Sequence, residues 1–189
     1  EYNASPGSQL KELGADIIIN PSASPFHLGK QSLRNRVFGG QASRFDIPVI
    51  YANQVGIHTE LLFDGASRAI NSNGEVAMQL PDFEESVGYI SFDEGTITSN
   101  ATLPIEIDEI ATLHQALIFG IKDYFKKMGF KKAVLGSSGG IDSALVQALL
   151  SQALGNDNVL AILMPSQFSS EGSINDAKKI SENLGNEYH

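Results

Sequence analysis

The stretch Gly136-Ser-Ser-Gly-Gly-Ile-Asp-Ser143 lies between a segment typical of a buried strand and a segment typical of a helix. Adjacent glycines flanked by serines let successive backbone N–H groups turn toward one point, which creates an anion-binding nest. The N-terminus of the following helix adds its partial positive charge. The stretch has neither the lysine of a Walker A loop nor the G-x-G-x-x-G pattern. We predict a phosphate-binding loop made of Gly136, Ser137, Ser138, Gly139, Gly140, Ile141, Asp142 and Ser143.

A phosphate loop without a lysine needs another source of positive charge beside a bound polyphosphate, and Mg²⁺ is the natural one. Asp142 is the only carboxylate in the stretch, so we predict that it is a magnesium ligand. The alternative is that the stretch is only a tight turn that caps the next helix.

The surrounding residues alternate between strand and helix patterns. Apolar residues at steps of three and four predict a helix over 108–128. Strands are predicted at 132–135, 159–164 and from 187 onward, with helices at 141–154 and 173–184 between them. This βαβαβ order is typical of a doubly wound parallel sheet.

The N-terminal half is richer in strands and turn signals. Helices are predicted at 5–13 and 31–45, and strands at 16–20, 48–55, 60–63, 67–71, 75–80 and 87–92. Asn73-Gly74 predicts a hairpin. We expect Arg34 to face solvent on its helix and 82–85 to be a polar turn. Residues 96–104 are polar and irregular, so we divide the chain into domains at 1–95 and 108–189, with a linker at 96–107.

Composition excludes several classes of function. The chain has 189 residues, 42% hydrophobic and 19% charged, with a net charge of −9 that disfavours nucleic acid and anionic membranes as partners. It contains no Cys, which excludes disulfides, thiolate metal sites and a cysteine nucleophile within these residues. No apolar run approaches the roughly 20 residues of a membrane span.

Two motifs in the C-terminal half carry a resemblance to known enzymes. The pattern Ser138-Gly139-Gly140-Ile141-Asp142-Ser143 resembles the pyrophosphate-binding motif of the N-type ATP pyrophosphatases, which split ATP between its α and β phosphates. The segment Met164-Pro-Ser-Gln-Phe-Ser-Ser-Glu-Gly-Ser173, followed by Asp176-Ala177, resembles a second segment of the NAD synthetases. The resemblance implies that this segment, Met164 included, faces the adenine and ribose of ATP.

The N-terminal half resembles the nitrilase-like glutaminase domain of the glutamine-dependent NAD synthetases, in the stretches 20–26, 29–30, 49–55 and 63–67. By position in the motif, Ser24 and Lys30 match the residues that hold the substrate glutamine. Many relatives have an arginine at the position of Lys30, and lysine cannot form the same bidentate contact with a carboxylate. The resemblance places the nucleophilic cysteine just before Glu1, so we expect no catalytic residue within this chain and regard it as a piece that crosses the domain junction.

The resemblance implies an α/β chain that begins with the C-terminal part of a nitrilase-like αββα sandwich and ends with the start of a Rossmann-like doubly wound parallel sheet. The implied enzyme is a ligase that converts deamido-NAD to NAD through an adenylate, with ammonia from glutamine, releasing AMP and pyrophosphate. Its substrates are ATP, deamido-NAD and glutamine, and Mg²⁺ is its cofactor. We expect a cytoplasmic homo-oligomer that binds no nucleic acid and no membrane.

Two alternatives remain open from the residues themselves. One is another glutamine amidotransferase of the ATP pyrophosphatase family. The other is a nitrilase-fold amidase that carries a nucleotide-binding appendage. A further reading is that these residues alone form an inert structural piece.

Overall fold

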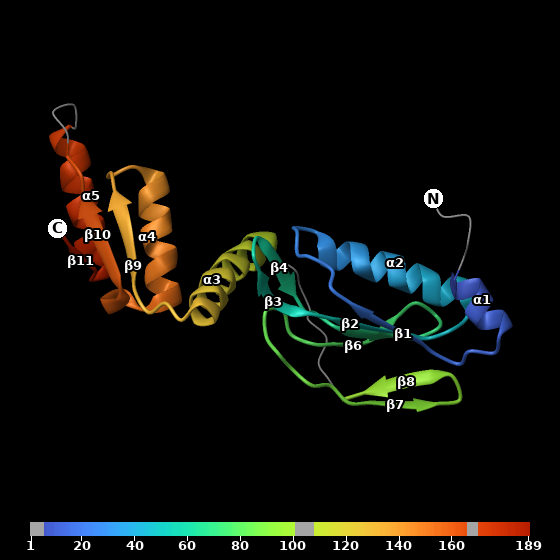
Figure 1. The fold of residues 1–189 in the computed structure, drawn as a ribbon. Coiled ribbons are helices and arrows are strands. Elements are labelled where there is room, and N and C mark those ends of the chain that lie inside the picture. Colours follow the sequence, from blue (N-terminus) through green and yellow to red (C-terminus); the bar gives the residue numbers. More distant parts are fainter. Residues whose placement is uncertain (1–5, 101–107, 166–169) are drawn as a thin grey trace. The chain divides into compact units, whose positions relative to one another are not determined.

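A computed structural model describes residues 6–100, 108–165 and 170–189. The chain divides into two compact units, with the boundary between Leu113 and His114, and each is described by itself (Figure 1). The boundary falls inside the helix α3 (Glu109–Met128). Within the described residues, no helix is both long and apolar enough to cross a membrane.

The first unit is built on a mixed sheet of four strands in the order β1-β2-β5-β6. The strands β1 (Ile18–Ser22) and β2 (Val49–Asn53) are parallel, whereas β5 (Arg68–Ile70) and β6 (Val76–Gln79) are antiparallel to their neighbours. The helix α2 (Lys30–Phe45) lies along one face of this sheet, and α1 (Pro6–Glu12) precedes it in the chain (Figure 1). Ala42 of α2 packs there against Val49 and Ile70.

Two hairpins complete the first unit. The strands β3 (Val55–His58) and β4 (Leu61–Asp64) form one, and β7 (Ile90–Asp93) and β8 (Thr96–Ser99) form the other. Ile97 of β8 is buried with Ala69 and Met78, and so belongs to a second apolar cluster of the unit. The irregular structure predicted from residue 96 is therefore wrong for Thr96–Ser99, because pairing with β7 and burial of Ile97 hold this segment as a strand.

Several element boundaries differ from the prediction. The strand predicted over 48–55 is two strands, because the backbone of Gln54 turns to bond Ser22 O and Gly65 N, each at 3.0 Å. The strand predicted from residue 87 begins only at Ile90. The hairpin at Asn73-Gly74 is confirmed, since β5 pairs with β6 and Gly74 has a φ of +88°.

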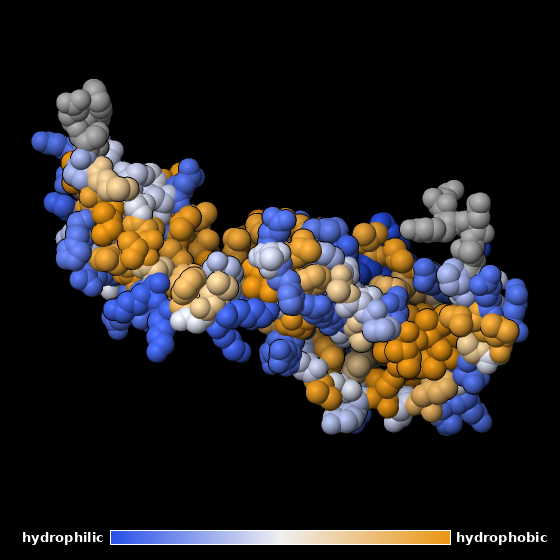
Figure 2. Space-filling view, viewed as in Figure 1, coloured by the Kyte–Doolittle hydropathy of each residue, from blue (hydrophilic) through white to orange (hydrophobic). Residues whose placement is uncertain are grey.

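The edge strand β1 alternates between partly buried and exposed residues. It covers Ile18–Ser22 rather than the predicted 16–20, and the Ile19 side chain is 65% exposed. Figure 2 shows that apolar side chains reach the surface in this unit. The strand that replaces the one predicted at 16–20 is therefore only partly buried.

The second unit has the predicted alternation of strands and helices. It consists of β9 (Ala133–Ser137), α4 (Ile141–Leu154), a short 3-10 turn (Asn156–Asn158), β10 (Val159–Leu163), α5 (Glu171–Leu184) and β11 (Glu187–Tyr188). The strands are parallel in the order β11-β10-β9. The βαβαβ prediction is confirmed, and the parallel pairing places the C-terminal ends of β9 and β10 at the same edge of the sheet.

The helix α5 begins two residues earlier than predicted. Its N-cap is Ser170, whose hydroxyl oxygen accepts a hydrogen bond of 3.1 Å from Ser173 N. Ser173 therefore lies in the first turn of the helix, next to the loop that follows β9.

Candidate functional sites

The loop between β9 and α4 passes against the first turn of α5. Gly139 has a φ of +79°, in the left-handed region that glycine adopts without steric cost. A Cβ atom at this residue would lie 2.1 Å from Ser173 O, a backbone atom. Only glycine therefore fits at this position of the loop.

The hydroxyl groups of Ser138 and Ser143 face each other inside the loop. Their oxygen atoms are 3.1 Å apart, and Ser143 donates a bond of 2.9 Å to Gly140 O. Ser138 N donates to the Ser143 hydroxyl and Gly140 N to the Ser138 hydroxyl, both at 3.3 Å. These are long bonds, so a phosphate oxygen can compete for the same N–H groups. The loop thus brings weakly bonded N–H groups to the N-terminus of α4, an arrangement that suits an anion.

Ser137, by contrast, points into the interior. Its hydroxyl donates a bond of 3.3 Å to Oε1 of Gln147, which is completely buried on α4. Nε2 of Gln147 donates to Ser181 Oγ at 2.9 Å and to Asn186 Oδ1 at 3.0 Å. A buried polar network thus joins the end of β9 to α4, α5 and the start of β11. This network could not be predicted from the sequence, because its hydrogen-bonded partners lie up to 39 positions apart.

Met164 lies beside the loop that follows β9, where it lines a pocket together with Ser138. A Cβ at Gly136 would be 2.7 Å from Met164 Cε, so the methionine side chain covers this glycine. A small pocket of about 70 Å³ lies between the loop and α5, lined by residues that include Ser138, Met164 and Ser173. The residues 166–169 of the second motif lie outside the described part of the chain.

Asp142 is exposed in the first turn of α4. Among the described residues, no group of three or more His, Cys, Asp or Glu side chains could hold a metal ion. A single carboxylate next to a phosphate loop nevertheless suits Mg²⁺, which often binds one carboxylate together with phosphate oxygens and water. The donor set therefore fits magnesium that arrives with a nucleotide, and does not fit a permanent metal centre.

The predicted glutamine-binding residues lie at opposite ends of the loop that joins β1 to α2. Lys30 is the first residue of α2, after Gly29 in the left-handed conformation (φ 75°). The Ser24 backbone is held at both polar groups. Its N–H donates to Asn53 Oδ1 at 2.8 Å, and its carbonyl oxygen accepts from Arg34 Nη2 at 3.0 Å and from Asn53 Nδ2 at 3.3 Å.

Arg34 is buried, and the prediction that it faces solvent is wrong. It forms a bidentate ion pair with Asp64, with N···O distances of 2.6 and 2.8 Å and side-chain exposures of 3% and 0%. The guanidinium also lies over the ring of Tyr51, 5.4 Å from its centroid. The helix places Arg34 on the face that packs against the sheet, where Asp64 at the end of β4 compensates its charge.

A second buried arginine, Arg68, supports the same region. It donates to the backbone oxygen atoms of Ala66 and Gln31 and to the Asn35 side chain. Burial, followed by the nearby positive charge of Arg34, lowers the pKa of Arg68 to about 10. It therefore remains charged at neutral pH.

Asp82 is half-buried and accepts a hydrogen bond from Gln31 Nε2. Burial raises the pKa of the Asp82 carboxyl, and the bond from Gln31 partly opposes this. The prediction of a simple polar turn at 82–85 is therefore wrong for Asp82, although Glu84 and Glu85 are exposed.

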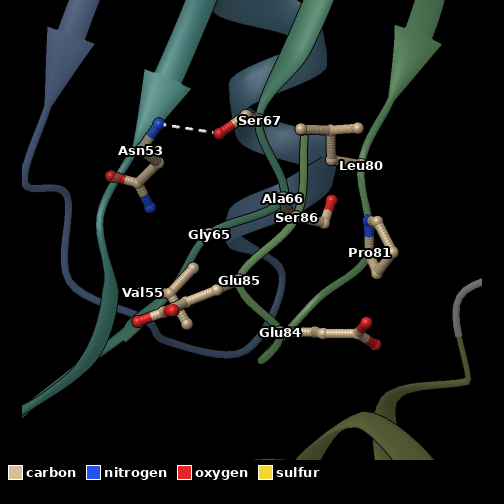
Figure 3. A pocket seen from close by; sticks show the side chains of 10 residues that line it. All are labelled: Asn53, Val55, Gly65, Ala66, Ser67, Leu80, Pro81, Glu84, Glu85 and Ser86. Atoms are coloured by element: carbon tan, nitrogen blue, oxygen red, sulfur yellow. Dashed lines mark hydrogen bonds between the residues drawn. The ribbon is translucent and has the colours of Figure 1, made fainter. Parts of the chain in front are cut away.

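A pocket of about 240 Å³ lies next to the end of β2 (Figure 3). Asn53 and Ser67 line one end, where Asn53 N donates to Ser67 Oγ at 2.9 Å. Figure 3 shows Glu84 and Glu85 at the other end of the lining. The Asn53 residue that holds Ser24 thus also lines an open pocket of the first unit.

Comparison with known proteins assigns each part of the chain to a class. The carbon-nitrogen hydrolase family model matches residues 8–101, and the NAD synthase family model matches residues 113–189. The glutamine-dependent NAD(+) synthetase of Synechocystis sp. is 44% identical over 186 residues, which cover 97% of this chain and 33% of the relative. The corresponding protein of Rhodobacter capsulatus is 40% identical over 180 residues, which cover 93% of this chain and 32% of the relative.

Solved structures agree with this assignment. The structure of glutamine-dependent NAD+ synthetase from Acinetobacter baumannii in complex with ADP matches with a TM-score of 0.89 and 34% identity, over 95% of this chain and 34% of that chain. The synthetase from Cytophaga hutchinsonii, at 20% identity and a TM-score of 0.76 over 95% of this chain and 36% of that chain, supports the fold alone.

The chain therefore joins a carbon-nitrogen hydrolase segment to an NAD synthase segment, and the second segment contains the glycine- and serine-rich loop 136–143. It belongs to the family of the glutamine-dependent NAD synthetases, whose enzymes are ligases. It spans about a third of the length of the curated relatives that it matches.

Proposed function

We propose that this chain is part of an enzyme that amidates deamido-NAD to NAD with ATP, using ammonia released from glutamine. The observation that carries the proposal is the loop after β9, where Gly139 lies against the Ser173 carbonyl in a nest that suits phosphate. The Acinetobacter baumannii synthetase is described in complex with ADP, which supports nucleotide binding by a protein of this kind.

In the proposed reaction, the nicotinate carboxylate oxygen attacks the α-phosphorus of ATP, and the bond from this phosphorus to the β-phosphate bridging oxygen breaks. The N–H groups of Ser138, Gly139 and Gly140 and the N-terminus of α4 stabilise the negative charge on the departing pyrophosphate. Mg²⁺, held by Asp142 and phosphate oxygens, would neutralise further charge when bound. Ammonia then attacks the acyl carbon of the adenylate, and AMP leaves.

For the glutaminase half, we propose that Ser24 and Lys30 bind substrate glutamine. A serine hydroxyl can bond its α-amino or carboxylate group, and the lysine cation can neutralise the carboxylate. We also propose that the nucleophilic cysteine precedes Glu1, and that the first unit is the C-terminal part of an αββα sandwich. The second unit is proposed as the start of a Rossmann-like doubly wound sheet.

The test uses the full-length protein that carries this chain. ATP–pyrophosphate exchange is measured with deamido-NAD, xanthosine monophosphate or aspartate as the acceptor, and we expect exchange with deamido-NAD only. Exchange with one of the other acceptors would assign the chain to a different amidotransferase of the ATP pyrophosphatase type. Glutamine hydrolysis without any AMP would instead indicate an amidase with a nucleotide-binding appendage.

A further inference from the structure

We propose that Asn53, together with the Arg34–Asp64 ion pair, acts as a clamp that positions the glutamine-binding loop through the backbone of Ser24. This inference rests on the proposed role of Ser24 in binding glutamine. It concerns positioning residues, none of which needs to touch the substrate.

The Asn53 side chain continues the sheet beyond the end of β1. The last residue of β1, Ser22, is in register with Asn53 of the parallel strand β2. Ser24 lies two residues further on, where β1 has ended, and the Asn53 carboxamide bonds both its N–H and its carbonyl oxygen. One side chain therefore provides the two hydrogen bonds that a neighbouring strand would provide.

The ion pair fixes the carboxamide in turn. Asp64 Oδ1 accepts from Arg34 Nη2 at 2.8 Å and from Asn53 Nδ2 at 3.3 Å. The Ser24 carbonyl accepts from the same two side chains. The side chains of Arg34 and Asn53 thus both donate to the Ser24 carbonyl and to Asp64 Oδ1. This arrangement allows the Asn53 carboxamide only one orientation, with its Nδ2 toward Asp64.

The burial of Arg34 and Asp64 supports a positioning role for this ion pair. A completely buried carboxylate and a nearly buried guanidinium seldom add net stability compared with apolar residues of the same volume. They do hold geometry, because a displaced partner would leave a buried charge without compensation. The atoms that they hold belong to Ser24, so the position of its hydroxyl group depends on them.

The clamp predicts a specific kinetic defect. In Asn53→Asp the side chain keeps its shape but replaces the Nδ2 donor with an oxygen that faces the Asp64 carboxylate and the Ser24 carbonyl. Repulsion then displaces the loop and weakens the proposed hydrogen bond between Ser24 and glutamine. We expect the KM for glutamine to rise about tenfold, which is the effect of losing one hydrogen bond to a charged group, with unchanged KM for ATP and unchanged kcat when ammonium chloride supplies the nitrogen.

Asn71→Asp is the matched control. The Asn71 side chain bonds both backbone groups of Ile97, at 2.7 and 3.1 Å, in the same unit but at β8. If a loss of stability alone raises the KM for glutamine, both variants show the rise. If the clamp positions Ser24, only the Asn53→Asp variant shows it. Thermal unfolding of both variants checks that their stabilities are comparable.

The experiment measures kcat and KM for glutamine, and ammonia-dependent kcat, in the full-length protein and its Asn53→Asp, Asn71→Asp and Ser24→Ala variants. If Asn53→Asp does not fold, Asn53→Ala removes the same donor without adding a charge. An unchanged glutamine KM in the Asn53 variant, or an equal rise in the Asn71 variant, overturns the clamp. An unchanged KM in Ser24→Ala alone overturns instead the proposed contact between the Ser24 hydroxyl and glutamine.

Discussion

Replacing Gly139 with alanine tests the phosphate loop at its tightest point. The new Cβ would lie 2.1 Å from Ser173 O, whereas carbon and oxygen atoms approach to about 3.3 Å without repulsion. The loop and the first turn of α5 must therefore separate by about 1 Å. The left-handed φ of +79° adds about 1–2 kcal/mol of backbone strain for a residue with a Cβ.

A shift of this size at the groups that bind the leaving pyrophosphate is expected to reduce AMP formation by about 100-fold or more. The assay is ATP–pyrophosphate exchange with deamido-NAD in the full-length protein, with glutamine hydrolysis measured in parallel. Glutamine hydrolysis should persist in the variant, because the substitution lies in the other unit.

Two further substitutions calibrate the result. Gly140→Ala changes the same loop at an extended φ of −84°, where the new Cβ meets only Ser138 Oγ at 3.4 Å, so we expect a smaller loss. Gly40→Ala introduces a Cβ into open space on α2 and should leave exchange unchanged. Exchange at the parent rate in Gly139→Ala, or equal losses in Gly139→Ala and Gly140→Ala, would refute the steric argument.

Three other substitutions test separate features. Gln147→Leu removes the hydrogen-bond partner of the buried side chains of Ser137, Ser181 and Asn186. It should lower the free energy of unfolding of the second unit by about 2 kcal/mol or more, which urea denaturation would show as a lower midpoint. An unchanged midpoint would contradict this. The pKa of Asp82 is raised by folding, so its contribution to stability is complete below its unfolded value of 3.8 and is lost as pH rises through the folded value. Asp82→Asn should therefore gain thermal stability relative to the parent as the pH rises above about 4, and a constant difference would count against the burial effect. Asp142→Asn should raise the Mg²⁺ concentration needed for half-maximal exchange by about tenfold, whereas an unchanged magnesium titration would remove Asp142 as the ligand.

The local chemistry of the sequence was enough to predict the alternation of strands and helices in the second unit and the glycine-rich loop between β9 and α4. Glycine and serine act through their own backbone conformations and hydroxyl groups, and strand and helix patterns depend on neighbouring residues. The predicted helix at 141–154 has the same bounds as α4, and the Asn73-Gly74 hairpin forms. Both features depend on interactions within a few positions.

Residues whose environment depends on distant parts of the chain were not predicted correctly from the sequence. Arg34 lies on a helix with little amphipathic pattern, so nothing near it indicated that Asp64, 30 positions away, would bury with it. Thr96–Ser99 has a polar composition, and only its pairing with β7 and the burial of Ile97 make it a strand.

The sequence alone therefore determined the family resemblance and the position of the glycine- and serine-rich loop before α4, because their motifs are contiguous. Only the tertiary structure decided how Ser24 is held. Its partners Asn53 and Arg34 come from β2 and α2, at separations of 29 and 10 positions, and meet only when the helix packs on the sheet. A buried hydrogen-bond network has no local signature, since each member is an ordinary polar residue until folding removes it from water.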